Sequence, residues 1–157
     1  MGMRLGSRLM PTMPDFPKEP AELAAFFQKH GEDCLPGLLG IDVVELKNGA
    51  CRLSMRIEQK HFASNGYLHA ASVIALADSA CGYGCVASLP DGASGFTTLE
   101  LKSNHVGTAL AGTIAAEARI AHGGRTTQVW DAVVTSTETG KPLALFRCTQ
   151  LILYPAN

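Results

Sequence analysis

The stretch "NGYLHAASVIALADSACGYG", residues 65–84, combines a helical pattern of apolar residues with one internal carboxylate. The apolar positions repeat with the period of a helix that buries one face: Val73, Leu76, Ala77 and Ala80. Asp78 lies among alanine, serine, glycine and cysteine, where a carboxylate costs free energy unless something compensates it. Asp78 is therefore either a paired core residue or a residue with a chemical task.

The same segment predicts a closely packed helix over residues 68 to about 87. Gly82 and Gly84 disfavour an isolated helix, so we expect other elements to approach it closely there. Cys81 and Cys85 are four residues apart on this helix and are expected to be small core residues.

The segments around this helix predict a short helix, a hairpin and four long strands. Residues 20–32 form the short helix, with Pro20 in its first turn, and residues 34–40 form a connector rich in proline and glycine. Asn48-Gly49 separates two alternating runs and predicts a hairpin. The four strands are expected at residues 96–106, 112–122, 125–137 and 142–154, with tight turns at Gly123-Gly124 and Thr139-Gly140.

This order of elements predicts an α+β fold in which a curved, six-stranded antiparallel sheet wraps around one long central helix. We expect residues 1–19, with three prolines, to be a flexible N-terminal arm, and residues 20–157 to form a single domain. Because the two edges of such a sheet invite pairing, the domain is expected to form a homodimer.

Composition excludes several classes of function. The chain has 157 residues, 46% of them hydrophobic and 17% charged, and its formal net charge of −1 gives no electrostatic reason to expect a nucleic-acid partner. No apolar run is expected to span a membrane, and no secretory signal is recognised. Five cysteines without a CxxC pair do not indicate a disulfide framework, so a cytoplasmic location is expected. The histidines lack metal-ligand spacing, so we expect no metal and no cofactor.

Several motifs together resemble a known family. Gly66 and His69 form G-x-x-H before the helix, and Asp78 follows His69 by nine residues within "ADSA" (77–80). "LLGIDVVELKNGACRLSM" (38–55) and the strand sequences after the helix match in order. The chain resembles the hotdog-fold acyl-CoA thioesterases of the phenylacetate-degradation, or PaaI-like, type over about residues 38–153. The resemblance implies the hotdog fold and hydrolysis of an acyl-CoA thioester to free acid and CoA.

The resemblance implies a catalytic pair. Asp78 would be the general base or the nucleophile, and the N–H of Ala70, in the first helical turn, would stabilise the oxyanion. Asp78 and His69 are nine residues apart, or about 13 Å along a helix. In the family each site is built across the dimer, so we expect this chain to form a homodimer or a tetramer of two dimers.

Three further residues are candidates for the catalytic site. His69 would orient the turn or the substrate, and Thr98 would lie near the acid. The family carries an asparagine six residues before the histidine, and this position is Ala63 here. The glycine that follows the histidine in the family is Ala70 in this chain. Asn65 could substitute for that asparagine through a shifted loop, or Asn65-Gly66 could simply form a turn.

Candidates for substrate binding are Gly66, in the family motif, and Gly124 and Arg125, which place turn amides and a cation where they could contact CoA phosphates. An ordinary solvated arginine is an equal alternative for Arg125. Tyr83, with Tyr67, Phe96 and Trp130, could line an aromatic or medium-chain acyl pocket or belong to the core. The acyl group itself is not defined by the sequence.

Two other functions remain open at this point. A non-catalytic acyl-CoA or acyl-carrier binding module is favoured by the missing asparagine. A hotdog hydratase or dehydratase generally pairs a histidine with the acid in another arrangement.

Overall fold

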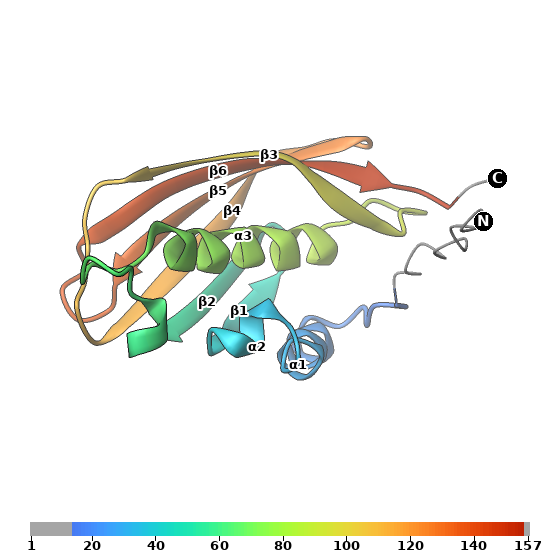
Figure 1. Cartoon of the computed structure of the whole chain (residues 1–157). Helices are drawn as coiled ribbons and strands as arrows, with labels where there is room; N and C mark the ends of the chain where they lie inside the picture. Colours follow the sequence, from blue (N-terminus) through green and yellow to red (C-terminus); the bar gives the residue numbers. More distant parts are fainter. Residues whose placement is uncertain (1–13, 156–157) are drawn as a thin grey trace, which may run out of the picture.

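The structure, a computed structural model, describes residues 14–155 of the chain. One six-stranded antiparallel sheet runs in the order β1-β2-β4-β5-β6-β3, and the long helix α3 lies along its inner face (Figure 1). The predicted α+β layout is confirmed. The elements are α1 (Pro20–His30), α2 (Leu35–Leu38), β1 (Ile41–Lys47), β2 (Ala50–Arg56), the 3-10 helix η1 (Gln59–His61), α3 (Ala70–Ala87), β3 (Gly95–His105), β4 (Thr113–Gly123), β5 (Thr127–Ser136) and β6 (Pro142–Leu153).

The sheet is amphipathic because alternate side chains of each strand face α3. On β5, Trp130, Ala132 and Val134 are buried, whereas Val133 between them is exposed. On the outer face, Arg147 donates two hydrogen bonds to the carboxylate of Asp131 on the neighbouring strand (2.6 and 2.7 Å). The inner face thus supplies the core and the outer face meets solvent.

The β1–β2 hairpin turns at Asn48-Gly49, as predicted, and Gly49 has a φ of +79°, which favours glycine. A bulge between Val43 and Glu45 shifts the register. The bulge explains why the apolar residues of β1 do not keep a strict alternation as far as Leu46, which is buried.

The two helix glycines lie where aromatic residues contact α3, as the sequence predicted. A Cβ atom on Gly84 would lie 2.6 Å from the ring of Trp130, and one on Gly82 would lie 3.0 Å from the ring of Phe96. Cys81 and Cys85 are fully buried, which confirms their prediction as core residues.

By length and composition, α3 is long and apolar enough to cross a membrane, with 18 residues and a mean hydropathy of 1.4. The expectation that no segment reaches this limit is therefore wrong for α3. However, 56% of this window is buried inside the structure, and a core helix passes the same test. Its apolar character follows from its position against the sheet.

The helices α1 and α2 pack near β1, on the side of α3 away from the rest of the sheet (Figure 1). The ring of Phe27 on α1 stacks on Tyr83 of α3 at 4.1 Å, and the Val43 N–H donates to Oε1 of Gln28 (2.8 Å). The predicted connector at residues 34–40 contains one helical turn, α2.

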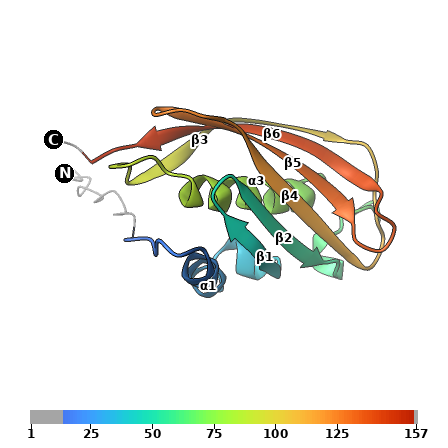
Figure 2. The ribbon, with the colours of Figure 1, turned by 180° about the vertical axis from the view of Figure 1, so that it is seen from behind.

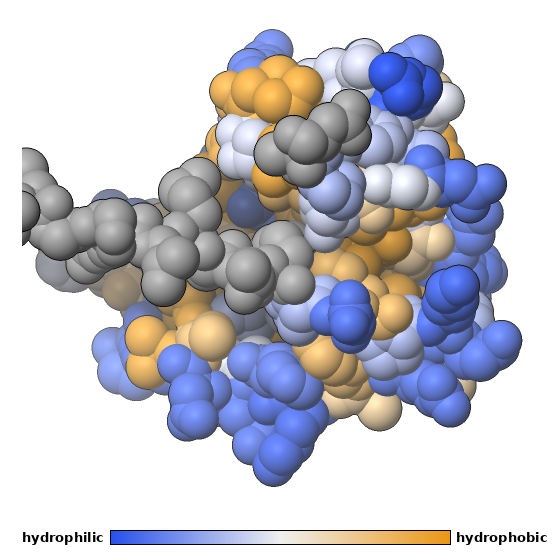
Figure 3. Space-filling model, turned by 90° about the vertical axis from the view of Figure 1, so that its right-hand side faces the viewer, coloured by the Kyte–Doolittle hydropathy of each residue, from blue (hydrophilic) through white to orange (hydrophobic). Residues whose placement is uncertain are grey.

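Most of the arm predicted at residues 1–19 lies outside the described residues. Within the described part, Phe16 packs against α1, with its ring centroid 5.7 Å from those of Phe26 and Phe27. The β4–β5 turn, the end of β6 and the end of α3 lie at the same end of the molecule as α1 (Figures 1 and 2). Hydrophobic side chains reach the surface between hydrophilic ones at this end (Figure 3).

Candidate active site

Asp78 lies in the middle of α3 and faces a pocket of about 240 Å³ between α3, α1 and β3. Its Oδ1 atom is buried and has no hydrogen-bond partner among residues 14–155. Burial raises the pKa of this carboxyl above its ordinary value. The pocket is lined by Phe16, Phe27, Asp78, Ser79, Gly82, Tyr83, Val86, Phe96 and Thr98. Within residues 14–155, the Oδ1 of Asp78 therefore lacks the partner that a purely structural carboxylate would need.

Three of the candidates from the sequence meet at this pocket: Asp78, Thr98 and Tyr83. Thr98 reaches it from β3, just before a bulge that separates Thr98 from Glu100. Burial raises the pKa of Tyr83 to about 12, so its hydroxyl is neutral at physiological pH. The pocket lining thus combines one carboxylate with three hydroxyl-bearing residues, Ser79, Tyr83 and Thr98, beside an apolar wall.

The second group of candidates lies at the start of α3. His69 is the N-cap, and its Nδ1 atom accepts a hydrogen bond from the Ala71 N–H (2.9 Å), while its carbonyl accepts one from the Ser72 N–H (3.0 Å). Ala70 is an exposed residue, and its N–H donates no hydrogen bond to any acceptor within the described part of the chain. His69 thus orients the first turn, and the Ala70 amide is a free donor at the positive end of the helix dipole.

The loop before α3 is a compact turn. The Ala63 N–H donates to the Tyr67 carbonyl (2.8 Å), and the Gly66 N–H donates to the Ala63 carbonyl (3.0 Å). Gly66 has a φ of +83°. The Asn65 side-chain oxygen accepts a hydrogen bond from the Tyr67 N–H (3.2 Å), so it takes part in the turn itself.

His61, which the sequence reading did not single out as a site residue, fixes this loop from inside. It is fully buried; its Nδ1 accepts from the Glu58 N–H (2.9 Å) and its Nε2 donates to the Leu39 carbonyl (2.8 Å). Its carbonyl accepts from the His69 N–H (2.9 Å) and the Ser72 hydroxyl (3.0 Å). No local motif marks this role, because it depends on Leu39, 22 residues earlier.

The third group, Gly124 and Arg125, lies in the β4–β5 turn. The Tyr154 hydroxyl donates to the Arg125 carbonyl (2.6 Å), and the Arg125 guanidinium lies 5.3 Å from the centre of the Tyr154 ring. This turn lies near the C-terminal end of α3. The side-chain amide of Gln128, on the strand that follows the turn, donates a hydrogen bond to the carbonyl of Ser88, the C-cap of α3 (2.7 Å). Within one chain, these residues and Ala70 lie at opposite ends of α3.

The other aromatic candidates divide between pocket and core. Phe96 lines the Asp78 pocket, whereas Trp130 is fully buried and donates a hydrogen bond to Gln128 (2.8 Å). Tyr67 is exposed in the loop before α3. The sequence reading missed Phe16 and Phe27, which come from segments far from the motif and have no pattern that links them to it.

Residues 65–143 match the family model described as "Thioesterase superfamily". The chain belongs to the thioesterase superfamily. It is 33% identical over 111 residues to the 1,4-dihydroxy-2-naphthoyl-CoA hydrolase of Listeria monocytogenes, covering 71% of this chain and 89% of that protein. The prediction that this thioesterase is an enzyme that hydrolyses thioesters is therefore confirmed.

Solved structures confirm the hotdog fold of the thioesterase. A mutant of thioesterase PA1618 from Pseudomonas aeruginosa has a TM-score of 0.77 at 26% identity, with 83% of this chain and 93% of that chain covered. The PaaI protein of Escherichia coli has the same fold, with a TM-score of 0.72 at 24% identity over 83% of this chain and 94% of that chain. The sequence resemblance to PaaI-like thioesterases agrees with both.

Proposed function

We propose that this thioesterase hydrolyses acyl-CoA thioesters and that Asp78 is the carboxylate that drives the reaction. The observation that carries the proposal is the buried, unpartnered Oδ1 of Asp78, which faces an apolar pocket. A carboxylate in such a place has a raised pKa and accepts a proton more readily than one in water. The name of the Listeria relative, a hydrolase of a naphthoyl-CoA, supports CoA as the thiol part of the substrate.

In the proposed reaction, Asp78 removes a proton from a water molecule while the water oxygen attacks the thioester carbonyl carbon. The carbonyl electrons move to oxygen and form an oxyanion. When the oxyanion collapses, the carbon–sulfur bond breaks, and the CoA thiolate takes the proton from Asp78. If Asp78 attacks directly instead, it forms an anhydride with release of the CoA thiolate, and water then hydrolyses the anhydride.

The oxyanion donor is proposed to be the Ala70 N–H of a partner subunit. Eight residues of helix, about 12 Å, separate Ala70 from Asp78 in one chain, which is too far for both to contact one carbonyl. At the edge strand β3, beside Thr98, the apolar side chains of Leu99 and Leu101 are exposed. Pairing of β3 with the same strand of a partner subunit would cover these side chains, and the two-fold symmetry would complete two equivalent sites at once.

A second relative supports the assignment of Asp78. Structures of thioesterase SAV0944 from Staphylococcus aureus carry alanine in place of a glutamine in one mutant and of a glutamate in another, fifteen residues apart. That protein is 28% identical to this chain, with a TM-score of 0.72 over 76% of this chain and 98% of that chain. Ala63 and Asp78, the positions of the family motif in this chain, are also fifteen residues apart, and we propose that Asp78 corresponds to that glutamate.

The remaining candidates have supporting roles in the proposal. Thr98 lies beside Asp78 in the pocket and would hold the water, and His69 would orient the Ala70 amide. Asn65 and Gly66 would shape the entrance through their turn. Arg125, with Gly124, would contact the CoA phosphates, because its guanidinium is exposed at a turn. Val133 and Leu145, exposed on the outer face, would join two dimers into a tetramer.

The test is release of CoA thiol from a panel of acyl-CoAs, measured with a thiol-reactive dye. We expect hydrolysis by the natural protein and a loss of kcat of about 10²–10⁴-fold in Asp78→Asn, the range for a lost general base. The matched control is Asp33→Asn, which changes an exposed carboxylate outside the pocket and should keep full activity. Unchanged turnover in Asp78→Asn, or tight acyl-CoA binding without thiol release by the natural protein, would contradict the proposal.

A further inference from the structure

The pocket beside Asp78 has aromatic walls. On one side, Phe27 and Tyr83 stack with ring centroids 4.1 Å apart and ring planes inclined by 12°. On another, the ring of Phe96 lies over Gly82, so close that a Cβ atom there would be 3.0 Å away. Flat groups between such walls gain from offset or edge-to-face contacts. The shape of the pocket therefore suits a flat acyl group.

One further aromatic residue comes from outside the core fold. Phe16 lies in the segment before α1, and its ring lies 5.7 Å from that of Phe27, at an angle of 37°. It contributes to the pocket near Val86, two helical turns beyond Asp78 on α3. Phe16 thus lies toward the end of the pocket that is remote from the carboxylate.

A second, larger hollow begins on the other side of Phe16. It has a volume of about 470 Å³ and is lined by residues 14–18, 23, 86–87 and 89–94. Phe16 and Val86 line both hollows. Of these two residues, Val86 belongs to the core helix α3, whereas Phe16 lies in the segment before α1. Truncating the Phe16 side chain is therefore the change that should connect the two hollows.

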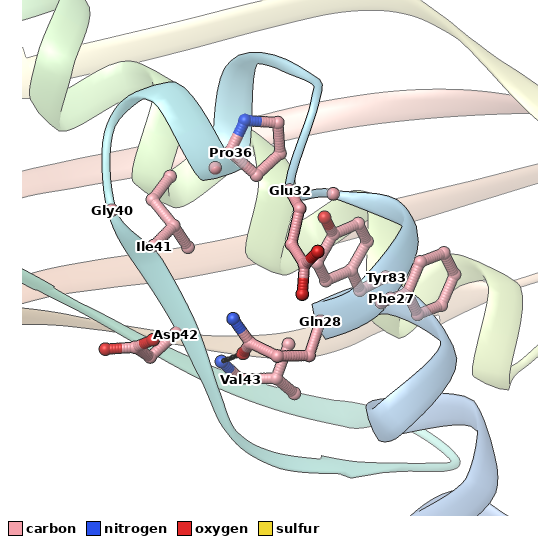
Figure 4. A pocket seen from close by; sticks show the side chains of 11 residues that line it. Phe27, Gln28, Glu32, Pro36, Gly40, Ile41, Asp42, Val43 and Tyr83 are labelled. Carbon is pink, nitrogen blue, oxygen red and sulfur yellow. Dashed lines mark hydrogen bonds between the residues drawn. The ribbon is translucent and has the colours of Figure 1, made fainter.

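The wall formed by Tyr83 and Phe27 borders a different hollow, of about 190 Å³, between α1, α2 and β1 (Figure 4). Glu32 and Asp42 line this hollow, and Asp15 and Asp91 line the larger one, so both hollows carry acidic residues. Phe16 and Val86 separate the larger hollow from the Asp78 pocket, whereas the smaller hollow lies behind the stacked rings of Tyr83 and Phe27. We therefore consider the larger hollow as the extension for a longer acyl chain.

We propose that Phe16 sets the upper size of the acyl group, so that this thioesterase prefers compact acyl groups built on one ring to long straight chains. The inference rests on the proposed function. A cavity of about 150 Å³ is enough to bind benzene, so the 240 Å³ beside Asp78 holds a ring and its link to the carbonyl. A twelve-carbon chain would have to pass Phe16 into the second hollow.

The test compares kcat/KM for benzoyl-CoA and dodecanoyl-CoA in the natural protein, Phe16→Ala and Phe26→Ala. Phe26 is the matched control, because it belongs to the same aromatic cluster but does not line the pocket. We expect the natural protein to favour benzoyl-CoA at least tenfold. Phe16→Ala should lower this preference about tenfold by raising the dodecanoyl value, and Phe26→Ala should change it less than twofold.

The same comparison is made for binding, as the ratio of Kd values by calorimetry in an Asp78→Asn background that turns over little substrate. Thermal unfolding checks that each variant is folded, and Phe16→Trp should reduce use of benzoyl-CoA. An unchanged preference in both ratios for Phe16→Ala, or a natural preference for dodecanoyl-CoA, would overturn the inference. Loss of the proposed hydrolysis would show instead as binding with no thiol release from any substrate.

Discussion

At the scale of single residues, the proposed catalytic role of Asp78 conflicts with the stability of the folded chain. Among the residues that the structure describes, the buried Oδ1 of Asp78 has no hydrogen-bond partner, so folding favours the neutral acid and raises the pKa. Catalysis by a general base needs the ionised form. The free-energy cost of the charged carboxylate therefore lies in the folded state and grows as the pH rises.

This conflict predicts that Asp78→Asn stabilises the protein at high pH. Because the pKa is higher in the folded chain, the folded state holds more protons than the unfolded state between the ordinary value of 3.8 and the raised value. The free energy of unfolding then falls as the pH rises through this range. We expect the Tm of Asp78→Asn to exceed that of the natural protein at pH 8, with a smaller difference at pH 4.5. An equal difference at both values would contradict the burial effect.

The same pKa predicts the acid limb of the activity profile. Since water activation needs ionised Asp78, kcat/KM should fall as the pH drops through the pKa of the free enzyme. We expect this limb to lie above 3.8, the ordinary value for aspartate. The measurement is kcat/KM for one acyl-CoA from pH 4 to 8, with circular dichroism at each pH to confirm folding. A limb at or below 3.8 would show that Asp78 is not the titrating base.

The sequence singled out Asp78, Tyr83 and Thr98, which line one pocket, because Asp78 and Tyr83 lie on the helix that carries the motif and Thr98 lies on the next strand. His61 and Phe16 could not be found in this way. Their roles depend on contacts with Leu39 and Phe27, which are distant in sequence and are brought near only by the packing of α1 and β1 on α3. No local period or spacing carries such information.

At the scale of elements, α3 is specified by what surrounds it. Its first turn is fixed by His69 and the buried His61, and its middle is fitted to aromatic rings at Gly82 and Gly84. The sequence predicted this helix and the hairpin at Gly49 well, because periodicity and turn chemistry are local. It placed the start of the helix at Leu68, before its N-cap His69, because apolar period alone does not locate a cap.

The fit at Gly84 predicts that Gly84→Ala destabilises the protein. Alanine in an exposed helix would normally gain about 0.5–1 kcal/mol over glycine. Here its Cβ would lie 2.6 Å from the fully buried Trp130 ring, and overpacking of this kind costs about 1–3 kcal/mol. We expect a lower midpoint in urea unfolding. In the Trp130→Phe background, which removes the contacting ring atoms, the same substitution should cost less; equal cost in both backgrounds would contradict the contact.

At the scale of the whole molecule, the proposed site needs two chains, because its carboxylate and its amide lie apart within one chain. Asp78 faces the pocket, whereas the free Ala70 N–H lies about 12 Å away at the end of the same helix. The exposed apolar side chains of β3 lie beside the pocket rather than at that distant end. A two-fold dimer would join the halves, so assembly and catalysis should be inseparable.

The proposed amide donor can be removed on its own. Ala70 is the first residue of α3, where proline is well tolerated, and His69 has the extended conformation that proline requires before it (φ −68°, ψ 132°). Ala70→Pro should therefore fold normally but lack the N–H, and lose about 10²–10³-fold in kcat. Ala70→Gly keeps the N–H and should stay active, which separates the donor from the side chain.

Mixed dimers then test whether the site crosses subunits. The heterodimer contains one Asp78→Asn chain and one Ala70→Pro chain and is purified through two different tags. If each site uses both chains, one of its two sites has both an intact carboxylate and an intact amide. Such a heterodimer should regain about half of the natural kcat per dimer, because one of two symmetric sites is restored. If Asp78 and Ala70 of the same chain acted together, both sites would be defective. The heterodimer would then be as inactive as either parent, and the cross-subunit site would be refuted.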